Sequence, residues 1–418
     1  MTQSILGKYS FGVGDRFAQQ AAAQIAAIEL AQKRGISITP VWNKSFREHT
    51  ITRSEPIQTR TAVDAAVKEM KWSKSYFVDA DHINLSTVDR FMDCSDYFTI
   101  DVADYIGKAA LTEDIEQFVK QNKKFTGDLN INDSVRTFHV SEEMLFSIAG
   151  RYLYAVREAG KIYSHIHRAK KGGAFVTEVS MDEAGSPQTP QELLFILAAM
   201  SEEKIPVRAI APKFSGRFNK GVDYAGNVDR FGRDFEELLA VIQFAVGEFG
   251  LPRDLKISVH TGSDKFSIYP IIRRAIRKYD TGIHLKTAGT TWLEEIIGLA
   301  EASKEGLEMA KEIYAKAFSR LDELCSDYTA VIGIDPRRLP PVSAVTGWDG
   351  KKFAEALRHD SGCPNYNPHF RQLMHIGFKI AADMGEQFKE EVRKNKEIIS
   401  KNVTGNLFNR HILRLFAD

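Results

Sequence analysis

Short apolar runs alternate with helical stretches along most of this chain. Eight such runs end in polar or charged residues: 9–17, 36–45, 75–84, 96–107, 173–183, 206–216, 255–265 and 281–291. Continuous apolar runs are typical of strands that are buried on both faces of a parallel sheet. Strands that alternate with helices indicate βαβ units, and eight of them favour a closed (β/α)₈ barrel of the TIM type. An open, doubly wound sheet is the alternative topology.

Two regions depart from this alternation. Residues 108–172 are mostly charged and helical in pattern, which predicts a helical insertion after the fourth strand. Residues 292–418 predict a helix-rich C-terminal extension that packs on the barrel, with breaks at 334–343 and 360–368. The barrel itself is expected to occupy residues 1–291, and the extension is a candidate cap for its mouth.

The composition excludes several classes of protein. Lys and Arg (56) nearly balance Asp and Glu (55) in the 418 residues, so the charge expected of a dedicated nucleic-acid binder is missing. The three cysteines, Cys94, Cys325 and Cys363, are far apart, which fits a reducing compartment rather than a disulfide framework. The N-terminal residues have no apolar signal-peptide core, and no apolar stretch reaches about 18 residues. We therefore expect a cytoplasmic protein without a membrane partner.

Ionisable residues stand where the predicted strands end. In barrel enzymes the active site lies at the C-terminal ends of the strands, and ionisable groups are costly to bury without partners. The residues in these positions are Asp15, Arg16, Asp79, Asp81, His82, Asp101, Asp104, Glu178, Asp182, Lys213, His260, Asp264, Lys265, His284 and Lys286. A polar pocket at this end of the barrel is the expectation.

Three histidines, His82, His260 and His284, stand at three different strand ends. Each of them alone reads more simply as a hydrogen-bonded structural residue. Together they make a metal site an equally good interpretation, because imidazole binds Zn, Ni, Fe and related ions. Lys213 and Lys286 are candidates for a Schiff base with a carbonyl substrate, but acidic neighbours would keep an ammonium charged and favour an ordinary cation.

Two other features have simpler explanations. Gly12-Val13-Gly14 lacks the third glycine of the dinucleotide fingerprint, so a tight turn between strand and helix explains it better. His359, His369 and His375 lie in an irregular, aromatic-rich segment of the predicted extension. They either pack within that extension or cap the barrel mouth.

Six segments of the chain resemble the tagaturonate/fructuronate epimerase family of hexuronate catabolism. These segments are FGVGDRF, FVDADHIN, FVTEVSMDE, APKFSGRFNKG, ISVHTGSDKFSIYP and GIHLKTAGTTW. The stretch HTGSDKFSIYP at 260–270 is the most distinctive of them, and the resemblance extends from about residue 10 to HFRQLMHIGFK. It implies a barrel fold, one divalent metal ion (Zn, Mn, Ni, Co or Fe) and the interconversion of D-tagaturonate and D-fructuronate.

The resemblance also implies roles for individual residues. The metal ligands would be His82, His260 and His284. Asp81 and Glu178 would form the acid/base pair, with Asp79 as an alternative to Asp81. For the substrate carboxylate, the cations suited to charge-assisted hydrogen bonds are Arg16, Lys213 and Lys286.

The two ketouronates differ at a carbon that is β to the ketone, whose C–H is not acidified by that carbonyl. Transient oxidation by a nicotinamide or retro-aldol cleavage and re-addition remain as routes. The missing dinucleotide fingerprint and the metal-ligand set favour the retro-aldol route, in which a metal stabilises an enediolate as a Lewis acid. A metal-dependent aldolase, a sugar isomerase, a Schiff-base aldolase and a non-catalytic sugar-acid binding protein are the alternatives, and an oligomer is compatible with each.

Overall fold

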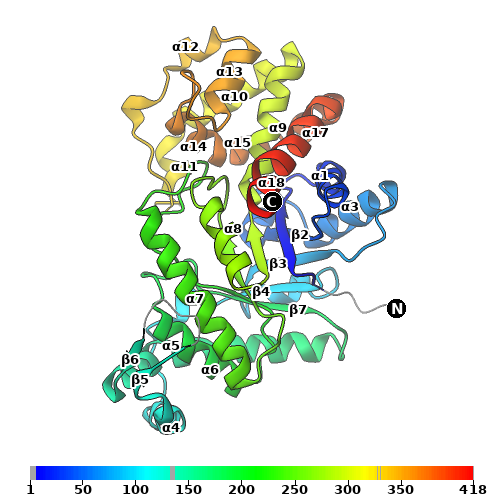
Figure 1. The fold of residues 1–418 in the computed structure, drawn as a ribbon. Helices are drawn as coiled ribbons and strands as arrows, with labels where there is room; N and C mark the ends of the chain where they lie inside the picture. Colours follow the sequence, from blue (N-terminus) through cyan, green and yellow to red (C-terminus); the bar gives the residue numbers. More distant parts are fainter. Residues whose placement is uncertain (1–5, 132–136, 327, 330, 418) are drawn as a thin grey trace.

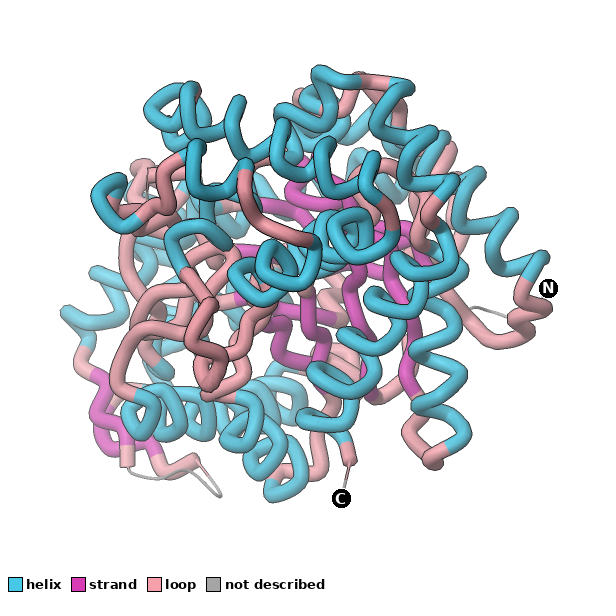
Figure 2. The backbone as a smooth tube through the Cα atoms, turned by 90° about the horizontal axis from the view of Figure 1, so that it is seen from above, coloured by secondary structure: helices cyan, strands magenta, loops and turns pink. Residues whose placement is uncertain are grey.

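A closed barrel of eight parallel strands forms the centre of the molecule (Figures 1 and 2). The computed structural model describes residues 6–131, 137–326, 328–329 and 331–417. In barrel order the strands are β1 (Tyr9–Gly14), β10 (Ile283–Lys286), β9 (Lys256–His260), β8 (Ala209–Ala211), β7 (Val176–Ser180), β4 (Tyr97–Asp101), β3 (Phe77–Ile83) and β2 (Ile38–Ser45). Each strand lies within one of the eight apolar runs. The predicted barrel is therefore confirmed, and the open sheet is excluded.

Helices connect the strands and surround the barrel (Figure 2). They are α1 (Ala21–Lys33), α2 (Phe46–Ile51), α3 (Pro56–Glu69), α5 (Glu142–Ala169), α6 (Pro190–Glu202), α7 (Val228–Phe249), α8 (Tyr269–Lys278) and α9 (Ala288–Ala302). Local signals mark their ends. Thr189 and Glu192 form a capping box at the start of α6, and Gly250 ends α7 in the left-handed conformation.

The insertion after the fourth barrel strand is helical, as predicted, but it also contains a small hairpin. Helix α4 (Thr112–Asn122) and helix α5 flank strands β5 (Gly127–Leu129) and β6 (Phe138–Val140), which pair antiparallel. Strands of three residues are too short to show a period of two, so the pattern gave no sign of them. Residues 132–136 of the predicted insertion lie outside the described residues, as do residues 1–5.

The predicted C-terminal extension is also helical. Its helices are α10 (Lys304–Ser319), α11 (Leu321–Ser326), α12 (Val342–Thr346), α13 (Gly350–Leu357), α14 (Pro368–Ile376), α15 (Phe378–Met384), α16 (Glu386–Lys394), α17 (Lys396–Gly405) and α18 (Leu413–Phe416). Helix α17 packs against α9 and α1, and α18 packs against α8 (Figure 1). The expected boundary at residue 291 falls inside α9, which follows β10 directly. Residues 327, 330 and 418 of the extension are not among those described.

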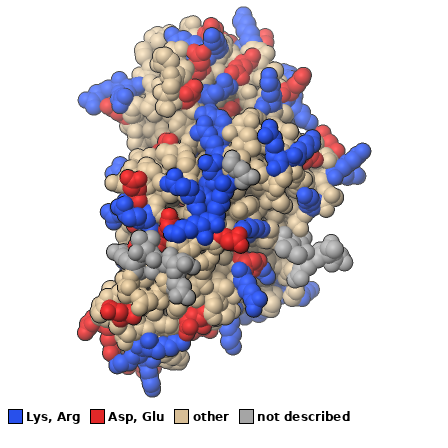
Figure 3. Space-filling model, in the orientation of Figure 1, with Lys and Arg blue, Asp and Glu red and all other residues tan. Residues whose placement is uncertain are grey.

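The nearly balanced charge is unevenly placed on the surface. Figure 3 shows a band of Lys and Arg side chains over the face where α8 lies. Two guanidinium groups of this helix, those of Arg273 and Arg277, donate to the backbone carbonyl oxygen of Ala417. These two arginines therefore fasten the chain at Ala417 to the barrel. Within the described ranges, no helix is both long and apolar enough to cross a membrane.

One buried carboxyl of α9 makes stability sensitive to pH. Glu295 is fully buried and accepts a hydrogen bond from Nε2 of Gln20 at 3.0 Å. The second oxygen of Glu295 and the amide oxygen of Gln20 find no partner among the described residues. Burial, with a further contribution from the charge of Asp15, raises the pKa of Glu295 well above its ordinary value of 4.5. The folded protein therefore holds this carboxyl protonated, which turns one unpaired acceptor into a donor.

We predict that Glu295→Gln stabilises the protein at alkaline pH. The unfolded chain releases the Glu295 proton above about pH 4.5 whereas the folded chain retains it, so this residue lowers the free energy of unfolding by about 1.4 kcal/mol per pH unit across that window. Glutamine keeps a neutral donor at every pH. Thermal unfolding from about pH 5 to 9 should show a Tm advantage of the variant that grows with pH. The exposed residue Glu305 supplies a control, Glu305→Gln, which should leave the pH profile unchanged; an advantage that shrinks with pH would contradict the assignment.

Candidate active site

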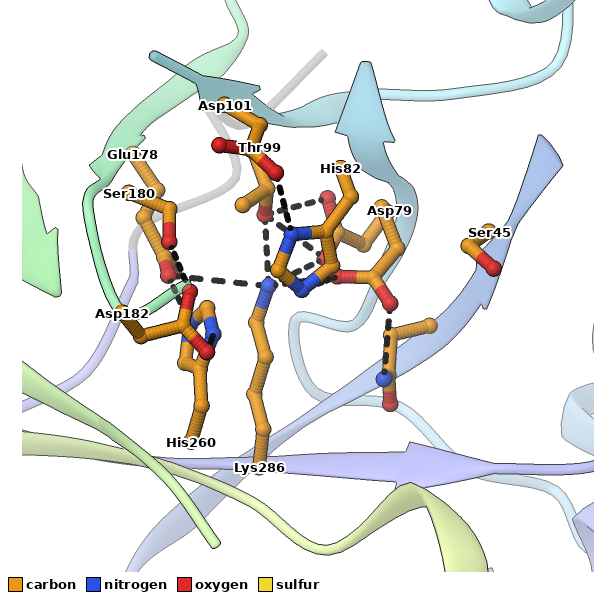
Figure 4. A network of polar contacts seen from close by, with 12 residues as sticks. Ser45, Asp79, His82, Thr99, Asp101, Glu178, Ser180, Asp182, His260 and Lys286 are labelled. Atoms are coloured by element: carbon orange, nitrogen blue, oxygen red, sulfur yellow. Dashed lines mark hydrogen bonds and ion pairs between the residues drawn. The ribbon is translucent and has the colours of Figure 1, made fainter. Parts of the chain in front are cut away.

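The register of the barrel strands arranges the polar side chains in layers. Lys286 of β10 is aligned with His260 of β9, and His284 is aligned with Ser258, one layer deeper. Figure 4 shows Glu178 of β7 and Asp79 of β3 turned toward the Lys286 ammonium from opposite sides. Some of the ionisable strand-end residues, among them Asp79, Glu178, His260 and Lys286, thus lie together inside the barrel.

The Lys286 ammonium lies at the centre of this group. Its Nζ donates to Asp79 Oδ2 at 2.8 Å, to Asp81 Oδ1 at 2.9 Å and to Thr99 Oγ1 at 2.5 Å, and it lies 3.6 Å from Glu178 Oε1. Burial lowers the pKa of Lys286, but the surrounding carboxylates outweigh burial and raise it well above its usual value. All three N–H groups of the Lys286 ammonium are engaged. The main role of this cation is therefore to hold the carboxylates of the site in place.

Glu178 is completely buried and saturated with donors. Its Oε2 accepts from the Tyr97 hydroxyl at 2.5 Å, and its Oε1 accepts from Ser258 Oγ at 3.0 Å. His260 Nε2 lies 2.5 Å from the same Oε1. Burial raises the pKa of this carboxyl, but Lys286 and His260 outweigh burial and hold it well below its usual value. Glu178 is therefore a carboxylate.

Asp81 is also ionised but less enclosed, with 5% of its surface exposed. Asn43 Nδ2 donates to its Oδ2 at 3.4 Å, while Lys286 takes the other oxygen. Burial raises the pKa of Asp81, but the charges of Lys286 and His82 lower it below the usual value. Asp79 differs, because burial and the neighbouring charge of Asp81 raise its pKa even against the opposing charge of Lys286. Of these two carboxyls, Asp81 is the one that stays ionised and can accept a proton at neutral pH.

His82 reaches the site through an irregularity in β3. The pairing of β3 with β4 shifts register between Ala80 and Ile83, and His82 adopts a left-handed backbone with φ of 50°. Its Nδ1 lies 3.0 Å from Asp101 Oδ2. A carboxylate on one ring nitrogen fixes the imidazole and leaves Nε2 for a metal or a substrate. The strained residue is therefore held in an orientation that suits a ligand.

His82, Asp182 and His260 form a group that could hold a metal ion. One ligand atom from each lies within 4.8 Å of the other two. The rings of His82 and His260 are 5.2 Å apart, and His260 Nδ1 lies 3.1 Å from Asp182 Oδ2 (Figure 4). Burial lowers the pKa of His260, but Asp182 and Glu178 raise it to about 9. A cluster that attracts protons this strongly offers the negative charge that a divalent cation requires.

His284, the third histidine of the predicted set, lies below this group. Its Nδ1 is 2.9 Å from Ser10 Oγ, and its Nε2 is 3.8 Å from Glu178 Oε2. Burial lowers the pKa of His284 to about 3, so the ring is neutral. Its Nε2 is a buried nitrogen without a hydrogen bond among the described residues. His284 is thus oriented by Ser10, and its Nε2 faces Glu178 Oε2 without a hydrogen bond among the described residues.

The predicted carboxylate-binding cations lie in three different settings. Arg16 is buried after β1, where its Nε donates to Glu48 Oε1 at 3.1 Å. Lys213 follows β8 and is partly exposed. Lys286 is enclosed by the carboxylates described above. The structure therefore brings Lys286 to Asp81 and Glu178, and leaves Arg16 and Lys213 at the rim of the barrel.

The distinctive segment HTGSDK ties the barrel to the C-terminal extension. Asp264, fully buried, accepts from Arg371 Nη2 at 2.9 Å, and its oxygens lie 3.2 Å from His359 Nδ1 and 3.1 Å from His411 Nε2. Nδ1 of His369 accepts from a backbone N–H at 2.9 Å. His359 and His369 are thus explained by packing of the extension.

Sequence reasoning proposed two of the three residues that could hold a metal ion, His82 and His260. Asp182 stood among the strand-end residues but was not chosen as a ligand, because its distance from His260 depends on how the loop after β7 turns. Tyr97, Thr99 and Asp101 are spaced two apart on β4, so all three face the barrel interior. Asp101 was among the strand-end residues, and that alternation is the signal that could have identified Tyr97 and Thr99 as well.

A sequence model of the tagaturonate epimerase family matches residues 2–412. The chain belongs to the tagaturonate epimerase family. The resemblance seen in the six segments is thereby confirmed, and the protein is an enzyme of the epimerase type.

Individual members of the family align over nearly the whole chain. A tagaturonate/fructuronate epimerase of Thermotoga maritima is 25% identical over 425 residues, which cover 96% of this chain and 80% of that protein. A crystal structure of the fructuronate-tagaturonate epimerase of Cohnella laeviribosi with one glycerol has a TM-score of 0.80 at 21% identity, over 99% of this chain and 82% of that one. The native form of that enzyme gives a TM-score of 0.78. At this identity the structural likeness shows a shared fold.

Proposed function

We propose that this enzyme interconverts D-tagaturonate and D-fructuronate by metal-dependent retro-aldol cleavage and re-addition. One observation carries the proposal: two ionised carboxylates, Asp81 and Glu178, flank a single ammonium beside the His82–Asp182–His260 group. The family and its named members support the substrate.

The residues present fit a divalent metal. Imidazole and carboxylate ligands of His82, His260 and Asp182 converge. Among the described residues, Nε2 of His284 has no hydrogen bond, and Nδ1 of His260 has none either although it lies 3.1 Å from Asp182 Oδ2. Either Asp182 or His284 would complete a set with His82 and His260. A bound divalent ion would supply Lewis acidity toward the oxygens of the substrate.

The two carboxylates supply the proton chemistry. Asp81, held ionised by Lys286, removes the proton from the hydroxyl on the carbon to be inverted, and the adjacent C–C bond breaks. The products are a three-carbon enediolate and a three-carbon aldehyde acid. The aldehyde turns over and the C–C bond re-forms from the opposite face. The proton that Asp81 removed returns to the new alkoxide on the Glu178 side, relayed through the Lys286 ammonium that contacts both carboxylates. Attack from opposite faces requires two proton-handling groups, which the barrel provides.

The setting of Lys286 argues against the Schiff-base alternative. An amine must lose its proton to attack a carbonyl, which requires a lowered pKa. Asp79, Asp81 and Glu178 raise the pKa of Lys286, and Thr99 Oγ1 takes its remaining N–H. A role in holding the carboxylates in place suits this residue better.

Metal removal tests the proposal. Dialysis against a chelator should lower epimerase activity by about 10³-fold or more, because Lewis-acid catalysis contributes several kcal/mol. Adding single divalent ions should restore activity with one of them, and product analysis should show the epimer rather than an aldose. Full activity in metal-free protein would refute the metal requirement, and stable three-carbon products would indicate an aldolase instead.

A further inference from the structure

The loop at residues 219–222, which follows β8, is fastened by buried groups on two sides. The fully buried Lys265 ammonium donates to two carbonyl oxygens of this loop, at 3.1 and 2.8 Å. The Gly221 N–H donates to Ser263 Oγ at 2.9 Å, and Arg371 Nε donates to the Gly221 carbonyl oxygen. Lys265 and Ser263 belong to the HTGSDK segment, so that segment fixes the backbone of a loop on a neighbouring strand.

This fixed loop carries Lys220, whose ammonium makes no hydrogen bond or ion pair with the described residues. The backbone N–H of Lys220 donates to the Val331 carbonyl oxygen at 2.8 Å. Within the described part of the chain its Nζ has no hydrogen bond or ion pair, and its contact is the Tyr328 ring, 5.2 Å from Nζ to the centroid. A partly buried cation without a partner is unfavourable, so an anion that is not part of the chain would compensate it.

The charges around Lys220 place it at the barrel mouth. Burial lowers the pKa of Lys220 and the nearby charge of Arg16 lowers it further, while Glu48 and Glu183 raise it. Arg16 follows β1, Glu48 lies in α2 after β2, and Glu183 is next to Asp182 after β7. The loop after β8 lies at the C-terminal end of the barrel strands, so Lys220 stands at the end of the barrel that holds the site.

His375 of α14 joins Arg16 to the Lys220 loop. Arg16 Nη1 donates to the His375 carbonyl oxygen at 3.4 Å, and a Cβ at Gly221 would lie 3.4 Å from the His375 Cβ. The His375 Nε2 lies 3.5 Å from the Gly262 carbonyl oxygen, two residues from His260. His375 Nδ1 is buried without a partner in the described ranges. Burial, Arg16 and Lys220 hold the pKa of His375 well below its usual value, so the ring is neutral.

We propose that Lys220 and Arg16 together bind the carboxylate of the substrate. Glu48 occupies the Nε edge of Arg16, and Nη2 remains for a bound carboxylate. With Nε2 of His375 donating to the Gly262 carbonyl, its Nδ1 is an acceptor, which suits the hydroxyl that neighbours the carboxylate in a ketouronate. The rigid loop lowers the entropy cost of placing the lysine.

Lys220 and Arg16 are called the carboxylate clamp below. The inference rests on the proposed function and gives this clamp a second task. After retro-aldol cleavage, the carboxylate belongs to the three-carbon aldehyde acid, the fragment that must turn over. No covalent bond then holds this fragment to the enzyme or to the enediolate. A clamp on its carboxylate lets the aldehyde rotate while the fragment stays in the barrel. Lys220 and Arg16 thereby prevent an epimerase from releasing aldolase products.

Lys220→Met tests the clamp, with Lys379→Met as the matched control. The ammonium of Lys379 lies 5.1 Å from the centroid of the same Tyr328 ring, but Lys379 belongs to α15 in the extension. We expect Lys220→Met to raise KM for D-tagaturonate at least tenfold, to leave bound metal unchanged and to release dihydroxyacetone with the three-carbon aldehyde acid. Lys379→Met should match the wild type in all three. Lys220→Arg, which keeps the charge, should recover most of the affinity.

Calorimetric titration separates this inference from the proposed function. Wild-type protein should bind D-tagaturonate more tightly than D-tagatose, which has a hydroxymethyl group in place of the carboxylate, and Lys220→Met should remove most of that preference. Lys220-dependent binding without epimerisation would refute the proposed function but support the clamp. Epimerisation by Lys220→Met with unchanged KM, unchanged preference and no released fragments would overturn the clamp.

Discussion

His260→Ala should abolish metal binding and lower kcat/KM by about 10⁴-fold. The Nε2 of His260 lies 2.5 Å from Glu178 Oε1, and its Nδ1 lies 3.1 Å from Asp182 Oδ2. His260 therefore connects the acid/base carboxylate to the His82–Asp182–His260 group that could hold a metal ion. Removal of a metal ligand removes the Lewis acid, and the loss of several kcal/mol of stabilisation corresponds to a factor of this size. Metal content after purification and steady-state kinetics measure the two effects together.

A control separates this effect from general damage. His165 is a partly exposed histidine of α5 that pairs with Asp89, and neither residue belongs to a barrel strand. His165→Ala should retain metal and activity. If His260→Ala keeps a full complement of metal, His260 is not a ligand and the site must be reassigned to the deeper His284 and Glu178.

Paired variants decide which residue completes the ligand set. The resemblance implies His284, whereas the converging atoms of His82 and His260 include Asp182. Asp182→Asn and His284→Ala therefore distinguish the two sets by metal content. The question arises because His284 lies one strand layer below His260, a depth that the sequence pattern does not reveal.

The barrel could be predicted because its signal is repeated eight times. Every strand is an apolar run buried on both faces, and every run leads into a helical pattern. The β5–β6 hairpin carried no such repeat and was missed. The boundary of the extension fell within α9 because the helix that closes the last βα unit and the helices of the extension share the same pattern.

The strand-end rule located the site because all parallel strands end at one side of the barrel. It predicts that Asp81, His82, Glu178, His260 and Lys286 lie in one pocket. It could not show that a bulge in β3 turns His82 toward Asp101. Nor could it find Lys220, because that residue lies in a loop whose course is set by contacts with Ser263, Lys265 and Arg371, far away in the sequence.

Asp81→Asn should retain the fold and the metal but lower kcat by about 10³-fold. General-base catalysis contributes about 10²- to 10⁴-fold, and an amide cannot accept the proton of the substrate hydroxyl. The pocket accommodates the new amide, because Lys286 still finds the amide oxygen and the buried Asn43 Oδ1, unpaired among the described residues, can accept from the new N–H₂ once Asn43 flips. The loss should therefore appear in kcat rather than in Tm.

Glu178→Gln should reduce turnover to a similar extent but with a measurable cost in stability. Glu178 accepts from Tyr97 and Ser258 and contacts His260, so an amide must set its N–H₂ against one of these groups. Kinetics, metal content and thermal unfolding of both variants distinguish the two carboxylates. The exposed pair partner of His165 gives the control Asp89→Asn, which should change none of the three. An Asp81→Asn enzyme with kcat within tenfold of the wild type would remove Asp81 from the mechanism and point to Asp79 as the base.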